Sequence, residues 1–477
     1  MSFAAPRSLS QVQEAFRNGE YTLSGLVDFY LNRISESDIN AFVEVYADEA
    51  LAKAHEVEAR MRDGKAGRLA GIVMGVKDNI SHKDHGVTAA SKILEGFTAV
   101  YSATVIERLE AEDAIIIGRL NCDEFAMGSS NEKSVYGPTL NPVDKQRVPG
   151  GSSGASAAAV AADLCLASLG SDTGGSIRQP AAYCGVVGLK PTYGRISRHG
   201  LLAYASSFDQ IGPLTHSVED AALLLEIMAG KDEYDSTASP EPVASYSQNL
   251  NYNGKARIGY LKECVDSEGL DPEIREAFNQ LKSKLEAAGH TVEPVSFPYL
   301  DYLIPAYYVL TTAEASSNLA RYDGIHYGYR SPEAAGIDGT YFKSRSEGFG
   351  EEVKRRIMLG TFVLSSGYYD AYYAKGQKVR RVIREATNKL LSDHDFLLLP
   401  TTPTPAFRFG ENNDNPVSMY LQDIFTVQAN LAGVPAISLP LAQTGNGLPI
   451  GFQLMAPHFK EENMLAFAAH MSEICKG

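Results

Sequence analysis

The sequence predicts an α/β protein with a large mixed, mainly parallel central sheet that is covered by helices on both faces. Two observations predict this class. Short apolar segments of strand length alternate with helical segments along much of the chain, a pattern typical of sheets built with crossover helices. The 477 residues are also 44% hydrophobic and 21% charged, so the chain can bury a large core. This composition excludes a disordered or fibrous protein.

The first 65 residues are expected to form helices. Apolar side chains recur at helical spacing over residues 23–34 and again over residues 51–57. Ser10 and Gln13 match a capping box, in which the side chains of a serine and a glutamine three residues apart cap the first turn. A helix is therefore predicted to begin at this point.

Residues 66–230 are expected to contain the core of the sheet. The strands predicted there are the short apolar segments 71–76, 114–117 and 164–169. Helices are predicted at 104–109 and 155–162. A loop rich in Gly, Pro, Ser and Asn runs from residue 128 to residue 154, and a loop of that length is usually functional.

The rest of the chain is expected to complete the same sheet, so that residues 1–477 form one domain. Residues 231–256 are polar and predict a surface linker. Strands are predicted at 258–261, 292–297, 396–399, 436–439 and 450–455, with the last two joined by a hairpin. One helix should begin after Asp271 as N-cap, with Pro272 in its first turn and Gly289 as C-cap, and another should close the chain at 464–474.

Charge and cysteine content limit the function and the compartment. The formal net charge of −15 argues against a free-standing nucleic-acid-binding protein. The five cysteines are scattered and show no metal-binding spacing, which favours a reducing compartment without disulfides. The first residues resemble no secretory or transit signal, and no apolar run reaches the roughly 18 residues of a membrane span. We therefore expect a cytoplasmic protein that does not contact a membrane.

A first candidate site is the turn Gly-Gly-Ser-Ser-Gly at residues 150–154, which contains Ser152 and Ser153. It matches the G-x-S-x-G nucleophile elbow, but that elbow requires a strand just before it. Residues 141–149 contain two prolines and three charges, which disfavours such a strand. The turn could equally be only an N-cap for the helix that follows, so the residues alone leave both interpretations open.

A second candidate is Ser176, which follows a predicted strand and the small residues Thr173, Gly174 and Gly175. Small residues allow several backbone N–H groups to converge, and such a group of donors can stabilise the oxyanion of acyl transfer. The alternative is a tight strand-to-helix connection or a phosphate-binding turn, although the sequence lacks the G-K-[ST] ending of a P-loop.

The ten histidines offer no obvious general base, and Lys77 is a better candidate. It ends an apolar strand, and ligands bind at the carboxyl ends of strands in open α/β sheets. Burial lowers the pKa of a lysine toward the neutral amine that a general base requires. The alternative for Lys77 alone is an ordinary lysine paired with Asp78.

Taken together, these segments resemble the amidase signature family. The resemblance is carried by residues 150–160, 170–181 and 184–191, and it extends through 77–79, 430–435 and 447–453 to nearly the whole chain. One departure is Ala155, where the family usually has glycine. This change adds a methyl group to the turn and removes no reacting group.

The resemblance implies the amidase-signature fold and a Ser-Ser-Lys triad. In that triad Ser176 would attack the amide, Ser152 would relay the proton and Lys77 would accept it, with Ser153 in support. The backbone N–H groups of Thr173, Gly174, Gly175 and Ser176 would form the oxyanion hole, and the peptide bond of Ser152 would be cis. The reaction would be hydrolysis of an amide through an acyl-serine.

Within the family, residues 136–142, 191–197, 345–350 and 354–361 are similar to the glutaminase subunits of tRNA-dependent amidotransferases. This resemblance implies that the chain hydrolyses glutamine. It also implies two partners. One is an amidating kinase, the B subunit, which binds ATP and Mg²⁺ and acts on Glu-tRNA(Gln) or Asp-tRNA(Asn), and the other is a small C subunit. The tRNA would be bound mainly by the partner, and this chain would hold no metal or cofactor.

The same resemblance nominates Arg356 for the α-carboxylate of glutamine, Asp423 for its α-ammonium group and Tyr307 for the pocket wall. Each could instead be an ordinary structural residue. Two other functions are a stand-alone amidase for small or aryl amides and a non-catalytic assembly subunit. A basic run, Lys375, Lys378, Arg380, Arg381 and Arg384, could touch tRNA or a partner, although its helical spacing favours a solvated helix face.

Overall fold

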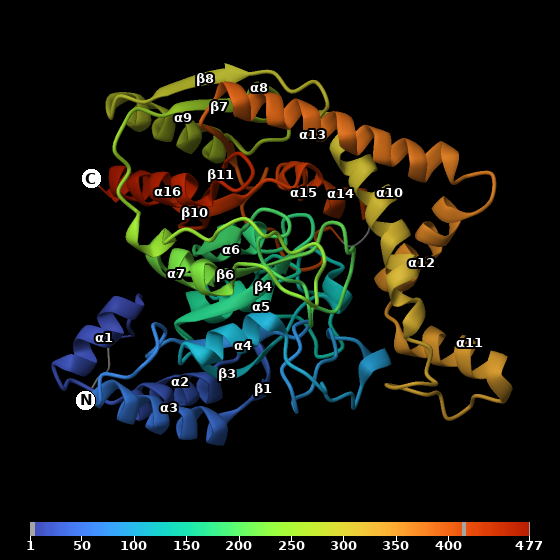
Figure 1. The fold of residues 1–477 in the computed structure, drawn as a ribbon. Coiled ribbons are helices and arrows are strands. Elements are labelled where there is room, and N and C mark those ends of the chain that lie inside the picture. The colour runs from blue at the N-terminus through green and yellow to red at the C-terminus, as the bar shows by residue number, and fades with distance from the viewer. Residues whose placement is uncertain (1–4, 413–415, 477) are drawn as a thin grey trace.

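The computed structural model describes residues 5–412 and 416–476, and its centre is one sheet of eleven strands (Figure 1). The strand order is β1-β3-β2-β4-β6-β5-β10-β11-β9-β7-β8. The strands are β1 (Phe42–Val45), β2 (Val73–Lys77), β3 (Ile115–Leu120), β4 (Ala167–Asp172), β5 (Val187–Lys190), β6 (Gln210–Thr215), β7 (Arg257–Leu261), β8 (Thr291–Val295), β9 (Phe396–Pro400), β10 (Ala436–Gln443) and β11 (Pro449–Met455). The predicted α/β class with a large mixed sheet is therefore confirmed.

Parallel pairing is concentrated in two groups of strands. Strand β2 pairs in parallel with β3 and β4, and β7 pairs in parallel with β8 and β9. The strands between these groups, together with the edge strand β1, pair antiparallel. At the centre of the sheet, β10 and β11 pair antiparallel as the predicted hairpin, and β5 pairs antiparallel with β6.

Helices pack against this sheet and extend from it. They are α1 (Leu9–Arg17), α2 (Leu23–Glu36), α3 (Ala47–Arg62), α4 (Thr104–Ala111), α5 (Gly154–Ala161), α6 (Arg178–Cys184), α7 (Val218–Met228), α8 (Lys262–Val265), α9 (Pro272–Ala287), α10 (Leu300–Asn318), α11 (Gly336–Gly348), α12 (Glu351–Leu364), α13 (Lys375–Asp393), α14 (Pro416–Leu421), α15 (Val427–Ala432) and α16 (Glu461–Lys476). Figure 1 shows α1–α3 gathered near the N-terminus and α10–α12 at the opposite side of the molecule.

Two predicted helix starts can be compared with the structure. The Asp271 side chain accepts a hydrogen bond from the Glu273 N–H at 2.8 Å, and Pro272 opens α9, as predicted. The capping box at Ser10 and Gln13 is wrong by two residues. Helix α1 is instead capped by Ser8, whose Oγ accepts a hydrogen bond from the Gln11 N–H. The Gln11 side chain in turn accepts a hydrogen bond from the Arg7 N–H.

The segment 231–256 is irregular apart from one short 3₁₀ turn, η3 (Tyr246–Gln248). Ion pairing of Asp235 with Arg198 and hydrogen bonds from Ser247 to Glu226 attach it to the body of the protein. Among the described residues, none of the helices has both the length and the apolar character needed to cross a bilayer.

Candidate active site

Lys77 lies at the carboxyl end of β2 and is completely buried. Its Nζ is within hydrogen-bond distance of three serine hydroxyls, at 2.7 Å from Ser152, 2.9 Å from Ser153 and 2.9 Å from Ser171. The peptide bond between Gly151 and Ser152 is cis. The structure thus brings Lys77 and Ser152 together from segments 75 residues apart.

The hydrogen bonds around Lys77 leave one direction for its lone pair. Ser153 donates its own hydroxyl proton to the Ser171 carbonyl, and the Ser171 hydroxyl also accepts from the Asn79 side chain. Both hydroxyls can therefore accept the two N–H groups of a neutral amine. The lone pair of that amine is then left facing the Ser152 hydroxyl. Burial lowers the pKa of Lys77 from 10.5 to about 8, which supports the neutral form.

Ser176 lies in the turn between β4 and α6, and this turn touches the Ser152 turn through the backbone. The Ser153 N–H donates to the Ser176 carbonyl at 3.2 Å. Within the described chain, the N–H groups of Thr173, Gly174 and Ser176 have no hydrogen-bond acceptor, so all three are free to bind a ligand oxygen. Gly175 differs, because its N–H donates to the Asp172 carboxylate at 2.8 Å. In this conformation the Gly175 N–H is therefore not available to an oxyanion.

A buried ion pair holds the Ser176 turn in place. The Arg178 guanidinium contacts both oxygens of Asp172, at 3.0 and 3.1 Å, and also donates to Asn430 and Gln453 near the end of the chain. Burial alone would raise the pKa of Asp172, but the charge and hydrogen bonds of Arg178, together with Lys190 and Asn430, outweigh burial and lower the pKa to about 2. The carboxylate is thus charged at neutral pH and fixes the turn by accepting backbone N–H groups.

The Ser152 turn requires glycine at its first positions. A Cβ on Gly151 would lie 2.1 Å from a carboxylate oxygen of the buried Asp123, which accepts backbone N–H groups from Asn131 and Lys133. Ala155 falls inside α5, where its methyl group is buried and its N–H donates to Asn131. Residues 141–149 form no strand in the described structure, so the turn is not a G-x-S-x-G elbow.

Arg356 lies on the buried face of α12, inside a cage of three tyrosines. Its guanidinium donates to Glu352 and to the Tyr204 hydroxyl, each at 2.8 Å. The aromatic rings of Tyr204, Tyr308 and Tyr420 surround it at 5.2–5.7 Å. Its Nη2 group has no hydrogen-bond partner among the described residues, and Arg356 lines the cavity described below. One edge of the guanidinium is thus free to bind a carboxylate.

Asp423 and Tyr307 are also buried close to the two serine turns. Asp423 accepts a hydrogen bond from the Ser129 hydroxyl at 2.7 Å, and burial raises its pKa to about 7. Tyr307 packs on the turn that contains Gly174 and Ser176, since a Cβ on Gly174 would lie 2.5 Å from the Tyr307 hydroxyl oxygen. Position 174 therefore has no room for a side chain.

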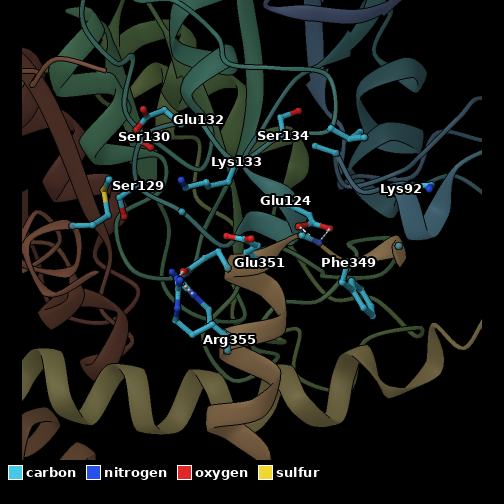
Figure 2. A pocket seen from close by; sticks show the side chains of 18 of the residues that line it. Lys92, Glu124, Ser129, Ser130, Glu132, Lys133, Ser134, Phe349, Glu351 and Arg355 are labelled. Carbon is cyan, nitrogen blue, oxygen red and sulfur yellow. Dashed lines mark hydrogen bonds and ion pairs between the residues drawn. The ribbon is translucent and has the colours of Figure 1, made fainter. Parts of the chain in front are cut away.

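A cavity of about 490 Å³ lies next to these residues (Figure 2). Its walls include Ser129, Ser130 and Lys133 from one loop and Arg355 and Arg356 from α12. Lys77, Ser152 and Ser176 are not among the residues that line this cavity. The wall is in direct contact with the Ser152 turn, however, because a Cβ on Gly151 would lie 2.6 Å from the Ser130 nitrogen.

Glu124 connects the two walls of this cavity. Its carboxylate accepts the Gly350 N–H at the start of α12, at 2.9 Å, and also contacts the Ser91 hydroxyl. Figure 2 shows Glu124 between the 129–134 loop and the start of α12. Burial raises the pKa of Glu124 to about 7. The Glu124 N–H also donates to the Lys133 carbonyl, so the start of α12, and with it Arg356, is tied to the loop that carries Ser129.

The sequence did not predict Ser171, whose hydroxyl accepts a hydrogen bond from Lys77 beside those of Ser152 and Ser153.

Replacing Ser171 with alanine should lower kcat for amide hydrolysis about tenfold, because loss of a hydrogen bond to a buried amine costs about 1.5 kcal/mol. KM should change little, since Ser171 is not among the residues that line the cavity. Steady-state kinetics would measure both values. Ser168→Ala on the same strand is the control, because Ser168 bonds the Ser156 carbonyl instead. Equal losses in the two variants would contradict the role of Ser171.

Comparison with known proteins agrees with this geometry. The family model described as Amidase matches residues 25–465. The A subunit of the glutamyl-tRNA(Gln) amidotransferase of Chlorobaculum tepidum is 51% identical over 96% of both chains. The crystal structure of the subunit of the same name from Thermotoga maritima is 40% identical, with a TM-score of 0.78 over 97% of this chain and 93% of that one. The peptide amidase of Stenotrophomonas maltophilia is 28% identical, with a TM-score of 0.83 over 98% and 97% of the two chains.

Proposed function

We propose, from the premise that this chain belongs to the amidase family, that it is the glutaminase subunit of a tRNA-dependent amidotransferase. In this role it releases ammonia from the side-chain amide of glutamine. The observation that carries the proposal is the buried Lys77 amine at 2.7 Å from Ser152, in a chain whose relatives at about half identity are named as the A subunit of that enzyme.

The reaction begins with the neutral amine of Lys77. Lys77 takes the hydroxyl proton of Ser152, Ser152 takes that of Ser176, and the Ser176 oxygen attacks the amide carbon. The N–H groups of Gly174 and Ser176 stabilise the oxyanion that forms. Lys77 then returns its proton through Ser152 to the departing nitrogen, and ammonia leaves an acyl-serine. Water attacks this ester, and its proton follows the same route to Lys77. The ester bond then breaks as Lys77 returns this proton through Ser152 to the Ser176 oxygen, and glutamate is released.

Glutamine is held by its two charged ends. Its α-carboxylate binds the free edge of the Arg356 guanidinium, and its α-ammonium group binds Asp423. Tyr307 packs against Gly174 and forms the wall beside the carboxamide. A cavity of about 490 Å³ is in the usual range for a small-molecule site and leads to these residues.

The ammonia is used in a partner. The B subunit, which is a kinase that binds ATP and Mg²⁺, amidates Glu-tRNA(Gln) or Asp-tRNA(Asn), and a small C subunit completes the complex in the cytoplasm. This chain binds no metal and makes few contacts with the phosphates of the tRNA, in keeping with its net charge of −15.

A stand-alone amidase would share the triad, and the fold similarity to a peptide amidase is why it is considered. The much higher identity to the amidotransferase A subunits favours the glutaminase. Reconstitution with the partner subunits decides between them. Ammonia release from glutamine that rises when partners, ATP and mischarged tRNA are added supports the proposal, and rapid hydrolysis of apolar amides without glutamine hydrolysis would contradict it.

Replacing Asp423 with asparagine should raise the KM for glutamine about 10- to 100-fold, because a charge-assisted contact worth about 1.5–3 kcal/mol is lost. In the unmodified protein KM should rise as the pH falls below about 7, where Asp423 becomes protonated and loses its charge. The Asp423→Asn variant should not show this rise. Initial rates at several glutamine concentrations and pH values would measure both effects.

Ser129→Ala provides the matched control for Asp423. Its hydroxyl stabilises the charged carboxylate, so its removal should raise the pKa of Asp423 further and move the rise in KM to higher pH. A KM that is independent of pH in the unmodified protein would exclude Asp423 as the ammonium ligand.

A further inference from the structure

Asp209 is a buried carboxylate that the reaction described above does not use. It lies directly before β6, is only 3% exposed and forms no ion pair with any described residue. Buried carboxylates are rare unless they are paired, because removing a charge from water is costly. The hydrogen bonds that Asp209 accepts come from two different segments, and each of these segments leads to one end of the glutamine site.

The first segment is the turn at residues 173–176, which we call the oxyanion turn. The Thr173 hydroxyl donates to Asp209 at 2.7 Å. The register of the sheet brings these residues together. Strands β4 and β6 pair antiparallel with Asp172 opposite Gln210, so the residue that follows β4 lies opposite the residue that precedes β6. Asp209 therefore holds the side chain of the residue with which the oxyanion turn begins.

The second segment leads to Arg356. Asp209 accepts the N–H groups of Tyr204 and Ala205 at 2.9 and 3.0 Å. The Tyr204 hydroxyl accepts a hydrogen bond from the Arg356 guanidinium at 2.8 Å, and the Tyr204 ring lies 5.5 Å from the same group. One carboxylate thus binds both the oxyanion turn and the backbone of the residue that orients Arg356.

Tyr307 connects the same two ends by a separate path. The Tyr204 hydroxyl donates to the Thr311 hydroxyl at 3.0 Å, and Thr311 donates to the Tyr307 carbonyl at 2.8 Å. The side chain of Tyr307 packs on Gly174 in the oxyanion turn, and the Phe208 ring lies edge-on to it at 5.9 Å. The contacts around Asp209 therefore form a closed ring and not a single chain.

The segment that carries Asp209 is held by two helices. Arg380 of α13 lies 3.9 Å from the Phe208 ring and donates to Ser207, so this member of the predicted basic run does not belong to a solvated face. The other four basic residues of that run are exposed, as expected for such a face. The Ser207 N–H donates to Glu314 of α10 at 2.9 Å. Asp209 is thus presented to the oxyanion turn from a fixed support.

We propose that Asp209 is a positioning residue that holds the oxyanion turn and Arg356 at a fixed spacing, and this proposal rests on the proposed function. Glutamine spans both groups, with its amide carbonyl at the oxyanion turn and its α-carboxylate at Arg356. A misplacement of about 1 Å can lower the rate of such a reaction about 100-fold. A fixed spacing also selects the length of the substrate, because asparagine is one methylene group shorter and cannot reach both groups equally well.

The test is steady-state hydrolysis of glutamine and of asparagine by the reconstituted complex that carries Asp209→Asn. Burial raises the pKa of Asp209 to about 7, so the assay is run above pH 8, where the carboxylate is charged. The variant keeps the size of the side chain but replaces one acceptor with a donor. With glutamine we expect kcat to fall about tenfold and KM to rise about fivefold. The preference for glutamine over asparagine in kcat/KM should fall at least fivefold.

Asp220→Asn is the matched control for this variant. Asp220 on α7 is also a buried carboxylate without an ion pair among the described residues, and it accepts the Leu9 N–H at 3.1 Å. Its replacement should change kcat, KM and the preference for glutamine less than twofold. An Asp209→Asn variant that behaves like Asp220→Asn would overturn the proposal.

Thr173→Val removes only the bond between Asp209 and the oxyanion turn. It should lower kcat about tenfold and leave KM for glutamine nearly unchanged, because the contacts of Tyr204 remain. Thr215→Val on β6 is its control and should change neither value, since the buried Thr215 hydroxyl donates to the Ser217 carbonyl instead. The double variant of Asp209 and Thr173 should have no lower kcat than Asp209→Asn alone, because both changes remove the same bond.

Multiplied losses in the double variant would overturn the proposal, as would equal effects of Thr173→Val and Thr215→Val. The second comparison decides the outcome if Asp209→Asn does not fold. Failure of the proposed function gives a different result. In that case the unmodified complex releases no ammonia from glutamine, and the role of Asp209 falls together with the function on which it rests.

Discussion

Replacing Ser176 with alanine is expected to reduce kcat for glutamine hydrolysis by about 10⁴-fold or more. The variant has no oxygen to form the acyl intermediate, and removal of the nucleophile from a serine triad typically costs this much. The fold should be unaffected, because the hydroxyl of Ser176 makes no hydrogen bond within the described chain and its backbone contacts remain. Ammonia release from glutamine at saturating substrate is the measurement.

Free ammonium supplies the control for this variant. In the reconstituted complex, Ser176→Ala should fail to amidate mischarged tRNA with glutamine as the nitrogen donor but should succeed with ammonium chloride. Rescue of this kind locates the defect in glutamine hydrolysis and not in assembly. Amidation that persists undiminished with glutamine would exclude Ser176 as the nucleophile.

The second large effect concerns Lys77 and pH. Since burial lowers the pKa of Lys77 to about 8, only roughly a tenth of the enzyme holds the neutral amine at pH 7. We expect kcat to rise about tenfold per pH unit below pH 8 and to level off above it. Lys77→Arg should lower kcat by about 10³-fold or more and remove this dependence, because a guanidinium stays protonated.

The pH profile of kcat at saturating glutamine separates Lys77 from Asp423, which acts on KM. Lys77→Met is a second variant, of similar length and without charge, and it should be as inactive as Lys77→Arg. A rise near pH 8 that survives in the residual activity of either variant would assign the base to another residue.

The candidate triad residues could be singled out from the sequence because each of them lies in a distinctive local pattern. Lys77 ends an apolar strand, and Ser152 and Ser176 lie in glycine-rich turns. Ser171 has no such pattern, since an isolated serine in a strand is common and its role depends on where the Lys77 amine points. The hydrogen bond from the Gly175 N–H to Asp172 could not be predicted either, because it depends on the folded path of the turn.

Strands with a continuous apolar run were the easiest elements to predict. Such runs predicted β2, β3, β4, β7, β9, β10 and β11 within a few residues. Strands β5 and β6 were not predicted, because β5 has only four residues and β6 contains Gly212 and Pro213, which usually interrupt strands. Helix α10 was missed because it contains Pro305 and has buried residues around most of its circumference.

The ion pair of Arg178 and Asp172 has a consequence for how the enzyme is made. Arg178 also bonds Thr426, Asn430 and Gln453, and the hydroxyl of Thr426 holds the Gly174 carbonyl at 2.6 Å. A nascent polypeptide that has emerged only to residue 400 already contains all three triad residues but lacks these supports. We therefore expect catalysis to appear only when translation is nearly finished, so that incomplete chains on the ribosome consume no glutamine.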